Sequence, residues 1–133
     1  MMLANQITSQ ADRRWLLQIA RDAVVAHLGG QATSAPASAE ILARRGAVFV
    51  TIRCRGDLRG CIGHLEVDPL VSVIPQCAVA ACNADPRFPP LTPSELPDAH
   101  IELSLLGPFE PLAGAAAIEI GRHGLVVERG PLR

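Results

Sequence analysis

Apolar residues recur every three or four positions near the start of the chain, in the pattern of an amphipathic helix. The pattern follows Ser9, with Asp12 three residues further on, as in a capping box with Asp in place of the usual Glu. Gly29 and Gly30 supply a stop signal. We therefore predict a helix over 9–28, with an apolar face formed by Trp15, Leu16, Ile19, Ala20, Ala23, Val24 and Leu28.

Strand-forming residues dominate two short segments in the middle of the chain, 47–54 and 58–63. The intervening residues 55–57 have the composition of a turn, so the two segments predict an antiparallel β-hairpin. The connection that precedes the hairpin, 30–39, is polar and rich in Ala and Ser. It predicts no regular structure, and a short helical turn is expected at 40–44.

A second apolar-periodic run predicts another helix, from Asp68-Pro69, a good cap and first-turn pair, to about Ala84. Pro75 interrupts the run, which predicts a kink or a late start. Residues 85–97 contain five prolines and predict a fixed loop, in which Thr92 caps a short helical turn.

The last part of the chain predicts further strands. Residues 101–105 alternate between apolar and polar, as in a half-buried strand, and 118–128 contains one or two more short strands. Helix, hairpin, helix and strands thus follow one another without regular strand–helix alternation. This order predicts a single α+β domain over 1–133, with a mainly antiparallel sheet and packed helices.

Composition excludes several classes of function. All 12 basic residues are arginine, so lysine Schiff bases, a lysine general base and a P-loop lysine are excluded. A net charge of −1 and 3 % aromatic residues give no strong nucleic-acid signal. The sequence shows neither a signal peptide nor a membrane-spanning run, so we expect a cytoplasmic protein with free thiols.

The hexapeptide LRGCIG at 58–63 is the segment that points most directly to chemistry. On a regular strand alternate side chains share a face, so Arg59 and Cys61 are expected on one face and Leu58 and Ile62 on the other. A neighbouring positive charge favours the thiolate, which is the form that attacks electrophiles and binds metals.

Two interpretations of this segment stay open. In the first, Cys61 is a reactive or ligand-binding thiol, and Arg59 activates it or holds an anionic group. Gly60 and Gly63 would then allow a ligand or a second backbone to approach closely. In the second, Cys61 is a small residue that serves packing, as most free cysteines do. His64 faces away from Cys61 on a regular strand, and only a bend at Gly63 would bring it to the site.

The remaining metal-ligand residue types are dispersed. Glu66 and Asp68 are expected in a solvated loop and as a helix cap. A metal site needs three or four converging ligands, and no histidine pair lies at helical spacing. We therefore expect no metal, and structural roles for Cys54, Cys77 and Cys82.

LRGCIG is similar to the defining motif of the AMMECR-type family, whose bacterial and archaeal members are called AmmeMemoRadiSam system protein A. Three further stretches resemble the family in the expected order: GAVFVT at 46–51, DPRFPPL at 85–91 and GRHGL at 121–125. The resemblance implies two unequal lobes with the LRGCIG strand near a cleft between them. It also implies a Memo-like and a radical-SAM partner, but no defined reaction or cofactor.

The resemblance extends the candidate site beyond the hexapeptide. Arg59, Cys61, Asp85 and Arg87 are expected to line one cleft, with His123 at its edge as a candidate acid or base. Two arginines beside a thiol would favour an anionic ligand. Alternatively, Asp85 pairs with Arg87 and both are structural.

Two functions therefore stay open. The chain is either an enzyme or enzyme subunit that modifies a small molecule or nucleic acid, or a non-catalytic binding or adaptor domain. Family members usually continue past the position of Arg133 with a further strand and helices. The resemblance thus implies a C-terminally truncated domain that exposes an apolar edge near 125–127, and we expect self-association or poor solubility.

Overall fold

The structure, a computed structural model, describes residues 9–31 and 38–106. In these residues helices and strands alternate irregularly, which confirms the α+β class. The elements are α1 (Gln10–His27), α2 (Ala39–Leu42), β1 (Arg45–Cys54), β2 (Asp57–Pro69), α3 (Leu70–Asn83), the 3-10 helix η2 (Pro93–Asp98) and β3 (Ala99–Leu106). The predicted strands within 118–128, the residue His123 and the apolar segment 125–127 lie outside the described residues.

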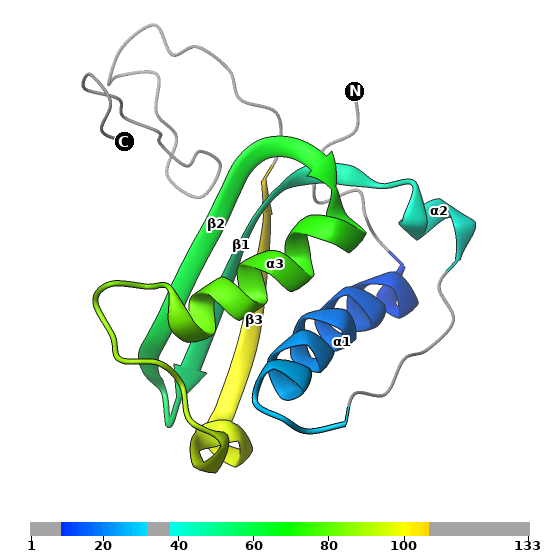
Figure 1. Cartoon of the computed structure of the whole chain (residues 1–133). Coiled ribbons are helices and arrows are strands. Elements are labelled where there is room, and N and C mark those ends of the chain that lie inside the picture. Colours follow the sequence, from blue (N-terminus) through cyan, green and yellow to red (C-terminus); the bar gives the residue numbers. More distant parts are fainter. Residues whose placement is uncertain (1–8, 32–37, 107–133) are drawn as a thin grey trace, which may run out of the picture.

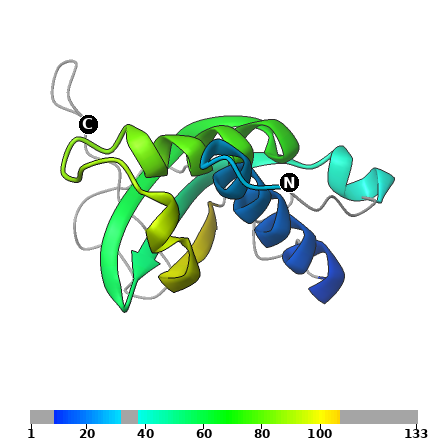
Figure 2. The same cartoon turned by 60° about the horizontal axis from the view of Figure 1, so that its bottom comes forward.

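The described strands form one antiparallel sheet in the order β2-β1-β3 (Figure 1). Helices α1 and α3 lie side by side against one face of this sheet, which gives two layers (Figures 1 and 2). The core lies between the layers, where Val48, Val50 and Ile52 of β1 are fully buried. The two-lobed arrangement with a cleft stays a prediction.

Helix α1 forms as the sequence predicted. The Ser9 hydroxyl oxygen accepts a hydrogen bond from the Asp12 backbone N–H at 2.9 Å, which caps the first turn. Leu16, Ala20 and Val24 follow at intervals of four and are buried, because this spacing keeps them on one side of the helix. Gly29, with φ 87°, takes the left-handed conformation just beyond the helix end.

The β1–β2 hairpin closes through a two-residue turn. Arg55 and Gly56 have φ values of 53° and 83°, as a type I′ turn requires. Strand β2 then continues well past the predicted end at Gly63. The prediction that Asp68 and Pro69 cap and start a helix is wrong, because these residues pair with β1. The predicted loop position of Glu66 is also wrong, because Glu66 lies within β2.

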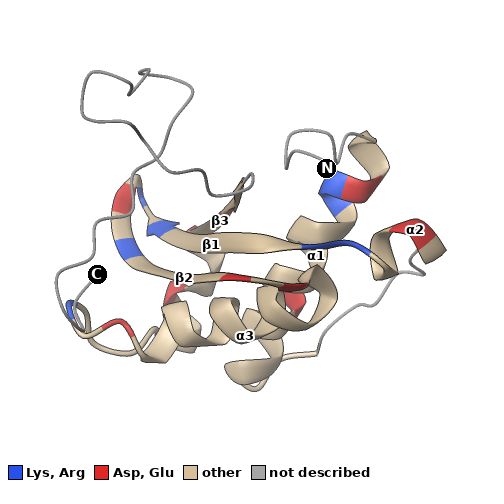
Figure 3. Cartoon of the chain, turned by 90° about the horizontal axis from the view of Figure 1, so that it is seen from above, with Lys and Arg blue, Asp and Glu red and all other residues tan. Residues whose placement is uncertain are grey.

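Helix α3 is almost wholly apolar and carries no charged side chain (Figure 3). It begins at Leu70 without a side-chain cap and runs through Pro75, so a late start does not occur. Its residues pack against α1, β1 and β2, and Ile74 and Ala78 are fully buried. None of the described helices combines the length and the hydrophobicity needed to cross a bilayer.

The pairing of β1 with β2 contains two irregularities that shape the candidate site. The first lies between Ile52 and Arg53 of β1, and the second between Gly46 and Val48. In both cases β2 contains more residues than the facing segment of β1, as in a β-bulge. A bulge changes the direction of nearby side chains, so regular alternation along β2 fails at these two places.

Candidate functional site

Arg59 occupies the extra position in the first bulge and joins β2 to the proline-rich loop. Gly60 pairs with Ile52 and Leu58 with Arg53, so Arg59 between them has no partner on β1. Its Nε and Nη2 donate to the two carboxylate oxygens of Glu95, at 2.8 and 3.0 Å. Its Nη1 and Nη2 donate to the carbonyl oxygens of Pro89 and Pro90, at 2.6 and 3.1 Å.

Each guanidinium nitrogen of Arg59 therefore donates to a protein acceptor, and only 16 % of the side chain is exposed. The ion pair also lowers the pKa of Glu95, mainly through the hydrogen bonds from Arg59. This bidentate geometry is the strong form of an arginine–carboxylate contact. The guanidinium thus serves as a structural link. Its described hydrogen bonds go to Glu95, Pro89 and Pro90, and none of them goes to the Cys61 thiol.

The Cys61 thiol lies next to a hydroxyl on the facing strand. Its Sγ is 3.3 Å from Thr51 Oγ1, and the two residues are direct cross-strand partners. Both side chains are partly exposed. The expectation that Arg59 and Cys61 share a face assumed a regular strand, and the bulge between Ile52 and Arg53 removes that condition.

Asp85 connects the LRGCIG strand to the loop that follows α3. Its carboxylate accepts hydrogen bonds from the backbone N–H of Cys61 at 3.0 Å and from that of Arg87 at 3.1 Å. The Arg87 guanidinium adds two more, at 3.0 and 2.8 Å. Only 4 % of the Asp85 side chain is exposed. The predicted pairing of Asp85 with Arg87 is confirmed.

These contacts favour the ionised form of the Asp85 carboxylate. The pKa of Asp85 is held well below its usual range, mainly by the Arg87 side chain and further by the two backbone N–H groups, against the opposing effect of burial. The pKa of Arg87 is raised, chiefly by Asp85. Arg87 keeps 56 % of its side chain exposed and lies over the Phe88 ring at 5.3 Å.

The two glycines of the hexapeptide give space to the protein's own groups. A Cβ on Gly60 would overlap the Ala81 carbonyl oxygen, so Gly60 allows β2 to lie directly against the backbone of α3. A Cβ on Gly63 would overlap the ring of Phe49, which is its cross-strand partner. The expected close approach of a second backbone is thus observed at Gly60.

His64 is paired with Asp68, another residue of β2. The second irregularity brings His64 Nε2 to 2.6 Å from Asp68 Oδ2. Their ligand atoms and that of the exposed Glu66 lie within 4.8 Å of one another, a grouping that could contribute to a cation site. Arg45 Nη2 already lies 3.7 Å from Asp68 Oδ1, and this positive charge opposes metal binding there.

The remaining cysteines are in environments that suppress the thiolate. Burial raises the pKa of Cys77, and it raises that of Cys82 to about 11. The pKa of Cys54 is also raised, first by burial and then by the charge of Glu95. The four described cysteines are free thiols. These environments agree with the structural roles predicted for Cys54, Cys77 and Cys82.

Two residues of the site were missed by reasoning from the sequence. Glu95 lies three positions after Thr92, whose backbone N–H donates to the Glu95 carboxylate at 3.1 Å, and this capping spacing was a usable signal. Thr51 carried no such signal, because its pairing with Cys61 depends on the bulge. His123, the predicted edge of the cleft, lies outside the described residues.

A family model and several related proteins match most of this chain. The AMMECR1 family model matches residues 17–133. A protein of Methanothermobacter thermautotrophicus is 41 % identical over 131 residues, covering 92 % of this chain and 68 % of that protein. A protein of Aeropyrum pernix is 42 % identical over 134 residues, covering 91 % of this chain and 57 % of that protein.

A solved structure also matches. The crystal structure of an uncharacterized protein from Pyrococcus horikoshii has a TM-score of 0.63 and 30 % sequence identity. The match covers 73 % of this chain and 52 % of that one. The chain thus spans about half to two-thirds of the length of the relatives it matches. Because the family model matches most of the chain, this protein belongs to the AMMECR1 family.

Proposed function

We propose that this chain acts as a non-catalytic binding domain in which LRGCIG braces the fold and holds the 85–91 loop in position for a partner. The observation that carries the proposal is the use of Arg59. Four of its five N–H groups donate to Glu95, Pro89 or Pro90, so the guanidinium is already engaged in holding the fold together.

The 85–91 loop has the properties of a preformed docking element. Asp85 anchors its start to β2, and Arg59 holds the carbonyls of Pro89 and Pro90. Its end is fixed by the Leu91 N–H, which donates to Cys82 O at 2.7 Å. Prolines restrict the loop backbone, so little conformational entropy would be lost on binding.

The exposed part of this loop has a composition suited to protein contacts. Pro86, Arg87, Pro89 and Pro90 are exposed, and Phe88 is partly exposed. Arginine and aromatic residues are enriched at the centres of protein interfaces. By family resemblance, the partners are a Memo-like protein and a radical-SAM protein. The loop would supply one arginine and one aromatic ring to that interface.

A second candidate function is catalysis by the Cys61 thiol. The observation that favours it is the environment of the sulfur, which is partly exposed and 3.3 Å from the Thr51 hydroxyl. Cys61 also contributes, after Asp85, to the raised pKa of Arg87, so thiol and guanidinium are near one another. In this function the domain would modify a small molecule or nucleic acid together with its radical-SAM partner.

Co-purification tests the binding function. The full chain would be co-expressed with a Memo-like and a radical-SAM protein from the same genome. We expect wild-type chain to retain a partner, and Arg87→Ala and Phe88→Ala to lose most of it. Arg55→Ala is the matched control, because Arg55 is 81 % exposed but lies in the hairpin turn. Equal retention by all variants would contradict the role of the loop.

A Cys61→Ser variant separates the two functions. If the domain only binds, the variant should retain the partners and support product formation by the assembled proteins at the wild-type rate. Full partner retention with complete loss of product would instead assign the chemistry to the thiol. Circular dichroism of the variant would verify that its fold is unchanged.

A further inference from the structure

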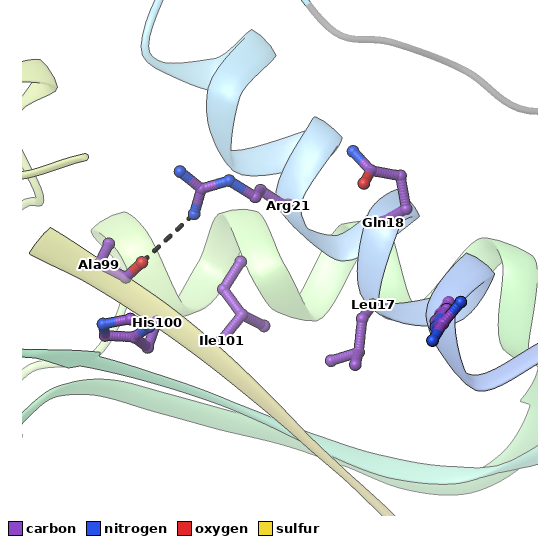
Figure 4. Close-up of a pocket in the computed structure, with 7 residues that line it drawn as sticks. Leu17, Gln18, Arg21, Ala99, His100 and Ile101 are labelled. Carbon is purple, nitrogen blue, oxygen red and sulfur yellow. Dashed lines mark hydrogen bonds between the residues drawn. The ribbon is translucent and has the colours of Figure 1, made fainter. Parts of the chain in front are cut away.

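A groove of about 430 Å³ lies between α1 and β3, away from LRGCIG (Figure 4). Its lining includes Arg14, Leu17 and Arg21 from α1 and His100 and Ile101 from β3. Leu17 and Ile101 point toward one another across it, and Arg21 reaches over to the backbone of β3 (Figure 4). The groove therefore combines an apolar centre with basic side chains.

Strand β3 forms one edge of the sheet among the described strands, whose order is β2-β1-β3. Arg21 Nη1 donates to Ala99 O at 3.2 Å, so this carbonyl points away from β1 and toward α1. In an antiparallel strand, the backbone groups of alternate residues point to the same edge. The N–H and C=O groups of Ile101 and Leu103 therefore also point outward, where no described strand pairs with them.

The arginines give this edge a positive charge. Arg14 and Arg21 are seven residues apart, about 10 Å along the helix axis, and both line the groove. Among the described residues, no carboxylate lies within ion-pair distance of either one. Arg14 is exposed, and Arg21 is half-buried and bonded to a neutral carbonyl. Both can therefore receive an anion without breaking an existing ion pair.

The apolar residues add a second element of recognition. Leu17 is 40 % exposed although it is a large aliphatic residue, and Ile101 opposite it is only partly buried. A side chain placed between them would be removed from water, which favours binding. The groove thus provides backbone hydrogen-bonding groups from β3, an apolar centre and two arginine side chains from α1.

We infer that this groove binds an extended peptide segment of a partner protein that carries acidic side chains, by adding a strand to the outer edge of β3. Peptides bind in this way when an open sheet edge lies beside a helix, where main-chain bonds give affinity and pockets give specificity. A second copy of β3 fits less well. Its one acidic residue, Glu102, is already paired with Arg53 at 3.1 Å.

Selection from a random octapeptide display library against the full chain tests this inference. We expect the selected peptides to be enriched in Asp and Glu alternating with aliphatic residues. A labelled peptide from the selection should lose at least about tenfold in affinity, or roughly 1.4 kcal/mol, with Arg14→Glu or Arg21→Glu. Arg13→Glu is the matched control, because Arg13 is also exposed on α1 but does not line the groove.

Backbone exchange distinguishes strand addition from other modes of binding. Amide hydrogen exchange should slow at Ile101 and Leu103 when the selected peptide is added, since their N–H groups would become paired. The inference would be overturned by no acidic enrichment, by unchanged affinity in both charge-reversal variants, or by unchanged exchange at both amides. Tighter binding of an oligouridylate than of any peptide through the same arginines would also overturn it.

Discussion

Arg59 and Glu95 form a bidentate ion pair that joins the bulge in β2 to the 3-10 helix η2, across 36 positions of the sequence. The same guanidinium holds two carbonyls of the proline-rich loop. One side chain therefore connects a strand, a loop and a short helix. This relationship assigns Arg59 a structural task at the centre of the LRGCIG segment.

Replacing Arg59 by lysine should destabilise the fold while keeping the positive charge. A lysine cannot form the forked contact with Glu95 and also reach both carbonyls. The loss of charge-assisted hydrogen bonds predicts a decrease of about 1.5–3 kcal/mol in the free energy of unfolding. Urea denaturation would measure it. In the exposed Arg55–Asp98 pair, Arg55→Lys should cost less than about 0.5 kcal/mol. Equal effects in the two variants would show that Arg59 is not a structural link.

Gly60→Ala should be among the most costly small substitutions in the sheet. The added methyl group would overlap the Ala81 carbonyl oxygen, so β2 and α3 must separate. Overpacking of this kind costs about 1–3 kcal/mol, and a backbone obstacle places the effect at the upper end. Gly46→Ala is the matched control, because its Cβ would meet Leu70 Cδ2 at an ordinary 3.5 Å. Thermal unfolding should give a clearly lower melting temperature for Gly60→Ala than for Gly46→Ala, and equal melting temperatures would contradict the prediction.

Asp85 should make the fold sensitive to acid. Its pKa is lower in the folded chain than its ordinary value of 3.8, so the ionised carboxylate stabilises the fold at pH values above 3.8. That contribution is lost as the pH falls below 3.8 toward the lowered folded pKa. Asp85→Asn should therefore be less stable than wild type at neutral pH, and the difference should shrink in acid. Melting temperatures of both proteins between about pH 2 and pH 7 would measure this. A difference that stays constant over this range would contradict it.

The cysteines should differ sharply in their rates of alkylation. Cys82 has a pKa of about 11 and is buried, so roughly one thiol in a thousand is ionised at pH 8. Cys77 is buried and its pKa is raised as well. Iodoacetamide should therefore label Cys61 in the native chain and reach Cys77 and Cys82 only after unfolding. Peptide mass spectrometry would give the order. If Cys61 is also protected until unfolding, the second candidate function is excluded.

Local sequence signals were sufficient for helix α1 and the hairpin turn, but not for the second half of β2. Ser9 and Asp12 predicted the start of α1, because a hydroxyl three residues before a backbone N–H satisfies an otherwise unpaired donor. Gly56 predicted the hairpin turn, since this turn needs positive φ values. The pairing of Asp85 with Arg87 was also predictable, because the two residues are neighbours in one proline-fixed loop.

The structure of the site depended on contacts that a single sequence does not specify. A two-residue turn at 55–56 and a regular ladder would place Gly60 opposite Thr51, but the bulge shifts the register by one residue and places Cys61 there. The bulge lies beside Gly60, where β2 runs directly against the backbone of α3. The sequence by itself thus determined the helices, the hairpin and the family. The tertiary structure decided that Arg59 binds Glu95, because only the packing of β2 against the distant 89–98 segment brings those groups together.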